Sequence, residues 1–275
     1  MKAAVWTGYG PPDVLRVTDV EKPSIRKGGE VLIRVRATAA STGDCELRRM
    51  KLPSLGFRIL ARLYFGVLRP RGKILGIDFA GQVEAVGKGV TRFKAGDEVF
   101  GTSGLRLGAY AEYVCLPEGG VMAMKPSNMT FEEAAAIPMG GLNALRFLRR
   151  ANVQRGQKVL VNGAGGSIGA MAVQLAKAWG AEVTAVDGPG KLDVLRSIGA
   201  DRVLDYTKED FTKRGDAYDV ILDVIGKSSF AGSLRSLKER GCYLIANPRR
   251  SQKVRGRWTS MTTTKEVFCG APTET

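Results

Sequence analysis

The sequence contains no histidine, and this absence narrows the chemistry that the side chains can perform. Histidine is the side chain whose ordinary pKa lies nearest to neutral pH, so it is a frequent general base and the commonest metal ligand. Any general base or metal ligand in this protein must therefore be another type of residue.

Cysteines and long apolar runs are also scarce. Only four cysteines occur, and they are scattered: Cys45, Cys115, Cys242 and Cys269. They form no C-x-x-C pair and no disulfide framework, which favours a reducing, cytoplasmic location. No run of about 18 apolar residues occurs, so we expect no membrane-spanning helix. The first residues, KAAVWTGYG, lack the pattern of a signal peptide.

Acidic residues are outnumbered, with 27 Asp and Glu against 42 Lys and Arg and a net charge of +15. This excess favours an anionic ligand or surface, although net charge mainly governs solubility and non-specific attraction. The chain has 275 residues, of which 44% are hydrophobic and 25% charged. That composition is typical of a globular protein with one large or two ordinary domains.

Two different patterns divide the chain. Up to residue 122, short β-rich segments such as EVLIRVRATA and GQVEAVG alternate with Gly, Pro and Lys breaks, which predicts antiparallel strands in a barrel-like domain. Beyond it, Thr130 and Glu133 have the spacing of a capping box, and six strands then alternate with helices, which predicts a parallel, doubly wound sheet. We therefore expect an α/β protein with domains at residues 1–122 and 123–275.

Two basic segments leave alternatives open. Residues 54–73 mix Arg with apolar and aromatic residues, and we favour a partly helical insertion packed on its domain over an amphipathic helix on a membrane surface. Residues 247–265 contain many basic residues, one Trp and no acid. Here we favour a loop between the fifth and sixth strands over a site for nucleic acid.

The segment VNGAGGSIG, after the apolar strand KVLV, predicts a dinucleotide-binding turn. Gly163 and Gly165 are expected to permit the tight turn, Gly166 to admit a pyrophosphate, and Gly169 to let the next helix pack closely on the strand. The N-terminus of that helix presents free N–H groups to phosphate. The expected contact residues are Gly163, Gly165, Gly166, Ser167, Ile168 and Gly169.

Asp187 ends the second strand of the doubly wound sheet, AEVTAVD. A carboxylate there can accept hydrogen bonds from the adenosine 2′-hydroxyl and repel a 2′-phosphate, which favours NAD over NADP. Lys191 can offset that repulsion or can be an ordinary solvated charge. The sequence therefore leaves the choice between NADP and NAD open.

Five segments in order resemble a known family: ILGIDFAGQVEAVG, RFKAGDEVFG, GAYAEYV, MTFEEAAAIPMGGLNAL and KVLVNGAGGSIGAMAVQLAKAWGAEV. They are similar to the medium-chain dehydrogenase/reductase superfamily, specifically its zinc-independent quinone-oxidoreductase-like branch, over nearly the whole chain. The resemblance implies a GroES-like catalytic domain, a Rossmann cofactor domain, a substrate cleft between them and a homodimer.

The zinc ligands of related dehydrogenases are replaced in this sequence. The family's Cys falls at Ser41, and its Gly-His-Glu motif falls at Gly76, Ile77 and Asp78. Serine and isoleucine cannot supply the thiolate and imidazole that zinc requires, and the four-cysteine structural lobe is missing. Cys45 is more simply an ordinary thiol. We therefore expect no metal.

Without zinc, the resemblance implies hydride transfer from NAD(P)H to a quinone or an α,β-unsaturated carbonyl, which needs no Lewis acid. The resemblance adds four residues near the cofactor: Asn143, Tyr206, Ile225 and Ala246. Thr42 and Tyr64 are candidates to hydrogen-bond the substrate oxygen or relay a proton. For these two residues we favour the alternative readings, a turn hydroxyl for Thr42 and a packing aromatic for Tyr64.

Two other functions stay open. The protein could be a zinc-free alcohol or aldehyde dehydrogenase, or a basic nucleotide- or RNA-binding protein with little catalysis.

In the resembled family further residues follow the sixth strand and complete the catalytic domain, whereas this sequence ends at KEVFCGAPTET. We therefore expect exposed apolar surface, weak stability and impaired activity.

Overall fold

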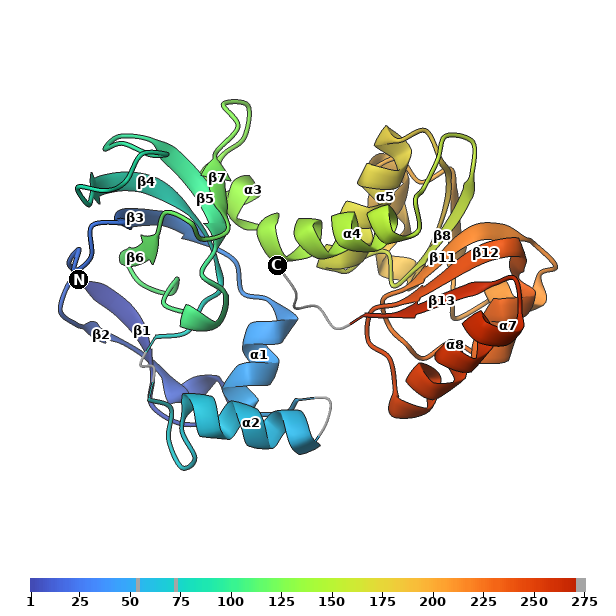
Figure 1. Cartoon of the computed structure of the whole chain (residues 1–275), viewed down its shortest axis with the longest axis horizontal. Coiled ribbons are helices and arrows are strands. Elements are labelled where there is room, and N and C mark those ends of the chain that lie inside the picture. The colour runs from blue at the N-terminus through green and yellow to red at the C-terminus, as the bar shows by residue number, and fades with distance from the viewer. Residues whose placement is uncertain (53–54, 72–73, 271–275) are drawn as a thin grey trace. The chain divides into compact units, whose positions relative to one another are not determined.

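The computed structural model describes residues 1–52, 55–71 and 74–270, which fall into two compact units, Met1–Pro138 and Met139–Thr275 (Figure 1). The division lies later in the chain than the boundary expected after residue 122. Helix α3 (Phe131–Ala135) accounts for the difference, because its Ala134 and Ala135 pack against Ala80 in the sheet of the first unit.

The first unit contains a five-stranded antiparallel sheet in the order β6-β3-β4-β5-β7. Its strands are β3 (Glu30–Thr38), β4 (Asp78–Val86), β5 (Glu98–Thr102), β6 (Tyr113–Pro117) and β7 (Met122–Met124). Val31 and Ile33 of β3 enter the main apolar cluster of this sheet, whereas Ala80 on the other face of β4 enters a second, smaller cluster. A hairpin of β1 (Lys2–Trp6) and β2 (Leu15–Asp19) completes the expected antiparallel architecture.

Two helices interrupt the strands of this unit, α1 (Thr42–Arg49) and α2 (Leu55–Phe65). Helix α2 occupies most of the segment expected to be a partly helical insertion, of which residues 54, 72 and 73 lie outside the described part of the chain. The helix ends before Gly66, whose φ of 126° is unsuited to other residues. In the described part of the chain, no helix is both long and apolar enough to cross a bilayer.

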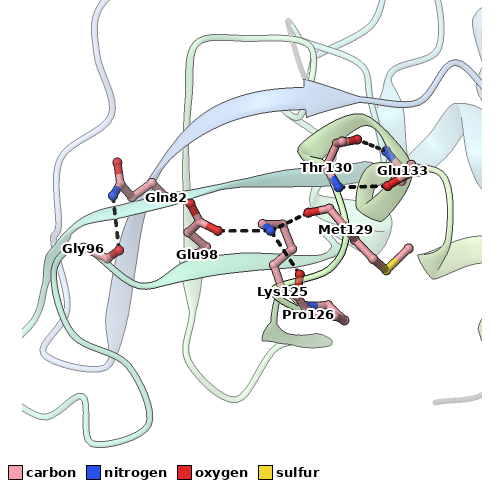
Figure 2. A network of polar contacts seen from close by, with 8 residues as sticks. All are labelled: Gln82, Gly96, Glu98, Lys125, Pro126, Met129, Thr130 and Glu133. Atoms are coloured by element: carbon pink, nitrogen blue, oxygen red, sulfur yellow. Dashed lines mark hydrogen bonds and ion pairs between the residues drawn. The ribbon is translucent and has the colours of Figure 1, made fainter.

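Lys125 ties the end of β7 to the start of α3 (Figure 2). Its ammonium donates to the carbonyls of Met129 at 2.6 Å and Pro126 at 3.1 Å and pairs with Glu98 at 3.1 Å, while its side chain is only 5% exposed. Directly beyond, Thr130 and Glu133 form the expected capping box, with each side chain accepting from the other residue's backbone N–H.

The second unit is a six-stranded parallel sheet in the order β10-β9-β8-β11-β12-β13, which confirms the doubly wound arrangement. The strands are β8 (Lys158–Asn162), β9 (Glu182–Asp187), β10 (Arg202–Asp205), β11 (Tyr218–Asp223), β12 (Leu237–Ile245) and β13 (Glu266–Cys269). The helices are α4 (Pro138–Arg150), α5 (Ser167–Ala178), α6 (Leu192–Ser197), α7 (Phe230–Arg235) and α8 (Arg250–Thr262).

Both faces of this sheet are buried. Val159 and Val161 of β8 enter one apolar cluster, whereas Leu160 between them enters the other. Successive side chains of a strand point to opposite faces, so an unbroken apolar strand such as KVLV requires cover on both sides. The ends of the strands are then the accessible part of the sheet.

Two local expectations for this unit were wrong. Residues 247–265 are not a loop, because α8 fills most of them, with Gln252 buried at its start and Gly256 against Val267 of β13. The segment CYLIAN predicts a fifth strand that starts at Cys242, but β12 begins at Leu237, because Leu237 pairs with Tyr218 of β11 ahead of a register shift. In both cases contacts with distant strands override the local pattern.

Replacing Lys125 with methionine should lower the free energy of unfolding by about 1–3 kcal/mol, because two carbonyls lose their buried donor. Urea denaturation measures the change. Lys88→Met, at an exposed position of the same unit, serves as the control and should stay within about 0.5 kcal/mol of wild type. Equal stability of the two variants would show that the Lys125 contacts contribute nothing.

Candidate functional site

The candidate site begins where the order of the parallel strands reverses. From β8 the chain continues to β9 on one side of the sheet, and β11 lies on the other side of β8. Ligands of open α/β sheets bind beyond the carboxyl ends of the strands at such a reversal. The turn from Gly163 to Gly169 lies at this point, between β8 and α5.

Two glycines of the turn do what the sequence led us to expect. Gly163 has a φ of 81°, and its N–H and that of Ala164 both donate to the carbonyl of Val186, at 2.9 and 3.1 Å. At Gly169 a Cβ would lie 2.3 Å from the Gly163 oxygen and 2.6 Å from the Ala164 Cα. Any side chain there would force α5 away from β8.

Gly165 differs from the expectation that it bends the turn. Its φ is not in the left-handed region, so another residue could adopt this backbone. The constraint is steric, because a Cβ would lie 2.2 Å from Cδ of Lys191 and 3.0 Å from Oδ2 of Asp187. A side chain here would displace Lys191 and crowd the carboxylate of Asp187 at the end of β9.

The N-terminus of α5 has the features of an anion site. Gly166 is its N-cap in an extended conformation, and no side chain of the described residues caps it. The first bond into the helix runs from Ala170 N–H to the Gly166 carbonyl at 2.8 Å, which leaves the N–H groups of Ser167, Ile168 and Gly169 ahead of it. A Cβ at Gly166 would come no nearer than 3.6 Å to its neighbours, so the approach to these donors is open.

Asp187 is bound to the turn itself. Its two carboxylate oxygens accept from the N–H of Gly165 at 2.7 Å and of Gly188 at 2.8 Å, and the side chain is 14% exposed. The ammonium of Lys191 lies 3.7 Å from Asp187 Oδ1 and donates to the Gly165 carbonyl at 3.0 Å. The lysine therefore offsets part of the carboxylate's charge.

The four other expected residues of this unit lie at four different places. Tyr206 is exposed beside Gly188, with its N–H donating to the Asp187 carbonyl at 3.2 Å, and Ile225 packs on Gly163 while remaining 48% exposed. Ala246 is buried at the end of β12. Asn143 is buried in α4, where its amide donates to the carbonyl of Met139 at 2.8 Å.

A buried polar network below the turn was missed by the sequence analysis. Asp223, at the end of β11, is fully buried and accepts from Asn162 at 2.9 Å, Gly226 N–H at 2.8 Å and the Tyr243 hydroxyl at 3.1 Å. Burial and, next, the Asp223 carboxylate raise the pKa of Tyr243. The sequence contained a signal for this network, because two apolar strands each end in a polar residue, Asn162 in one and Asp223 in the other.

The loop after Asp223 is held from several sides. Gly226 has a φ of 69°, and its carbonyl accepts from the buried Gln252 of α8 at 3.3 Å. The carbonyl of Val224 accepts from Asn247 at 2.8 Å. These bonds hold Ile225 against Gly163, so the loop and the glycine turn form one rigid edge.

The two candidate substrate-binding residues of the first unit belong to helices α1 and α2. Thr42 is the exposed first residue of α1, and Tyr64 of α2 is 61% exposed with its ring edge against Phe65. Ser41 caps α1, and its hydroxyl donates to Asp44 Oδ2 at 2.6 Å. The roles of Thr42 and Tyr64 stay predictions.

A half-buried tyrosine lies in the same part of the first unit. Tyr110 lies beside Asp44, and its pKa is raised, by burial first and then by the carboxylate of Asp44. Its hydroxyl therefore stays protonated at neutral pH.

The residues present do not fit a zinc ion. Among the described residues, no group of three or more Cys, Asp or Glu is placed to hold a metal, and the chain has no histidine. Ser41 and Ile77, at the positions of the family's ligands, are a helix cap and a half-buried side chain. Cys45 is an exposed free thiol.

Comparisons with known proteins agree with this geometry. Residues 27–126 match the family described as alcohol dehydrogenase GroES-like domain, and residues 167–255 match the one described as zinc-binding dehydrogenase. A quinone oxidoreductase of Pseudomonas aeruginosa is 34% identical over 87% of this chain and 71% of its own length. The chain belongs to the medium-chain dehydrogenase/reductase superfamily.

Its place within the superfamily is the quinone oxidoreductase and alkenal/one reductase branch. A 2-methylene-furan-3-one reductase of Solanum lycopersicum is 35% identical over 89% of this chain, which spans 62% of that relative's length. The structure of the quinone oxidoreductase from Coxiella burnetii superposes with a TM-score of 0.83 at 29% identity, covering 99% of this chain and 83% of that one. The GroES-like unit and the Rossmann-like sheet are those of this superfamily.

Gly169→Ala should lower the free energy of unfolding by about 1–3 kcal/mol, because its Cβ would meet backbone atoms that cannot move aside. The matched control is Gly190→Ala, where a Cβ meets nothing within 4 Å. It should stay within about 0.5 kcal/mol of wild type. Chemical denaturation of both variants measures the difference, and a tolerated Gly169→Ala would disprove the close helix–strand contact.

Proposed function

We propose that the protein is an NAD(P)H-dependent oxidoreductase that reduces a quinone or an α,β-unsaturated carbonyl without a metal ion. The observation that carries the proposal is the uncapped N-terminus of α5 behind a glycine turn at the reversal of the sheet. Membership of the quinone oxidoreductase branch supports the same chemistry. The nicotinamide would supply a hydride to the acceptor carbon.

The chain's own residues would bind and orient. The N–H groups of Ser167 and Ile168 point along the start of α5 toward a pyrophosphate, and the absence of a side chain at Gly166 lets it approach. Ile225, held by the bonded loop after β11, and Ala246 would border the nicotinamide ring and its ribose. Asn143 would lie near the same end of the cofactor.

Substrate contacts would come from the first unit. The hydroxyls of Thr42 and Tyr64 are exposed and can each donate a hydrogen bond to a carbonyl oxygen, which develops negative charge as hydride arrives. A proton must reach that oxygen to complete the reduction, and either hydroxyl can pass it from solvent. Catalysis would then depend mostly on positioning.

Purified protein should oxidise NADPH or NADH with a quinone or an enone, and a primary alcohol with NADP or NAD should give no turnover. Gly166→Ala should raise the Kd of the reduced cofactor at least tenfold in fluorescence titration, because its methyl group occupies the approach to the α5 donors. Its circular dichroism melt should stay close to wild type, since there is room for a Cβ.

The contrary outcomes are specific. Turnover only with the alcohol would identify a zinc-free alcohol dehydrogenase. No turnover with any acceptor, together with salt-sensitive retention on RNA, would identify a basic RNA-binding protein.

Lys191 is the residue that we propose to select NADPH. Its ammonium is 53% exposed and lies above the Asp187 carboxylate, whose oxygens are already bonded to two backbone N–H groups. A 2′-phosphate would therefore meet a lysine and the hydroxyl of Tyr206 rather than a free carboxylate. Location in the cytoplasm and assembly as a homodimer stay predictions from the sequence.

Lys191→Met should weaken NADPH binding at least tenfold while changing NADH binding less than threefold, because only NADPH carries the phosphate that the ammonium neutralises. Titration of both cofactors measures this. Lys213→Met, at an exposed lysine of the same unit, is the control. Equal losses for both cofactors would mean that Lys191 only supports the turn. Asp187→Ala, which removes the bond from Gly165 N–H in the turn, should show such equal losses.

A further inference from the structure

Helix α2 presents an apolar face that nothing in the described structure covers. Four large side chains on this face are each between 51% and 64% exposed: Leu55, Ile59, Leu60 and Leu63. Val67 and Leu68, directly after the helix, are 50% and 86% exposed. We call these six residues the α2 surface. Soluble proteins rarely expose so many large apolar side chains together unless the patch binds something.

The opposite face of α2 anchors the helix to the first unit (Figure 1). Ala61 and Phe65 are buried, and the Phe65 ring lies 6.4 Å from that of Trp6. Arg62 stacks over the ring of Tyr9 at 4.8 Å and donates to the carbonyl of Val67 at 2.5 Å. Residues at 55, 59 and 63 are four apart, so they lie along one side of a helix that is already fixed on its other side.

The charges within the segment that contains α2 have one sign. The sequence contains no Asp or Glu from residue 47 to residue 77. Arg58, Arg69 and Arg71 are exposed beside the apolar side chains. A helix with an apolar outer face bordered by arginines is typical of helices that lie in the interface of an anionic bilayer.

A second copy of the chain fits this surface poorly. A twofold contact of the α2 surface with itself would bring Arg58 and Arg69 of both copies together with no acid nearby in the sequence to separate them. Anionic lipid headgroups would instead neutralise the arginines, and each arginine near the membrane surface would add to the binding free energy. Leu60 and Leu63 would enter the boundary between headgroups and acyl chains.

We propose that the α2 surface binds the surface of an anionic lipid bilayer, with α2 parallel to the membrane plane. This membrane contact does not depend on the proposed reaction. If the reaction also holds, the contact places the enzyme where apolar, membrane-dissolved acceptors are concentrated.

Sedimentation with vesicles tests the proposal. The protein should bind vesicles of phosphatidylcholine with 30% phosphatidylglycerol at least tenfold more tightly than vesicles of phosphatidylcholine alone. The reason is that the arginines are attracted only to the anionic lipid. The double variant Leu60→Glu and Leu63→Glu should lose at least tenfold in the partition coefficient, and Arg58→Glu with Arg69→Glu should abolish the preference for the anionic lipid.

Matched controls carry the same changes elsewhere. Val17→Glu with Val194→Glu adds two acids at exposed apolar positions, 75% and 60% exposed, and should leave binding unchanged. Arg250→Glu with Arg257→Glu removes two exposed charges from the basic helix α8 and should reduce binding less than threefold. Circular dichroism melts verify that each variant is folded.

Three results would overturn the proposal. One is the absence of binding to anionic vesicles by wild type. Another is an equal loss with the α2 and α8 variants, which would reduce the effect to net charge. The third is a dimer in sedimentation velocity that the Leu60 and Leu63 changes dissociate, which would make a second copy the occupant of the surface.

Discussion

The buried carboxylate of Asp223 joins the parts of the second unit that form the candidate site. It accepts hydrogen bonds from Asn162 at the end of β8, from Tyr243 in β12 and from Gly226 in the loop after β11. A buried carboxylate is costly unless donors surround it, so these three groups are held where they are. The glycine turn starts one residue after Asn162 and inherits that fixed position.

The glycine turn is shaped by packing as much as by backbone freedom. Gly163 needs its left-handed conformation, but Gly165 and Gly169 need only the absence of a side chain. Asp187 and Lys191 close over Gly165 and each bonds to its backbone, so the acid and the lysine both support the turn. In the proposed function the same two side chains would also border the adenosine ribose, so cofactor selection and turn stability would share them.

The first unit combines a well-packed sheet with an unusually apolar exposed helix. The contacts of Lys125 and the capping box of α3 stabilise one end of its sheet, whereas α2 turns leucines and a tyrosine outward. Part of the positive charge of the chain lies in the segment around that helix, where no acid occurs between residues 47 and 77. Helix α8 carries a second basic segment.

The sequence by itself determined the features that depend on near neighbours. The capping box at Thr130, the end of α2 at Gly66, the tight turn at Gly163 and the alternation of strands and helices all follow from residues a few positions apart. The family could also be recognised, because its motifs are continuous segments. Those interactions are local, so the sequence contains both partners side by side.

Only the tertiary structure decided the features that join distant segments. Most of residues 247–265 form helix α8, because Gln252 bonds to the loop after β11 and Gly256 packs against β13. Local patterns in the sequence do not reveal these contacts. Gly165 meets Lys191, and Asn162 meets Asp223, across long stretches of chain. Such contacts form only when the sheet brings strand ends together, so no reading of one segment at a time could supply them.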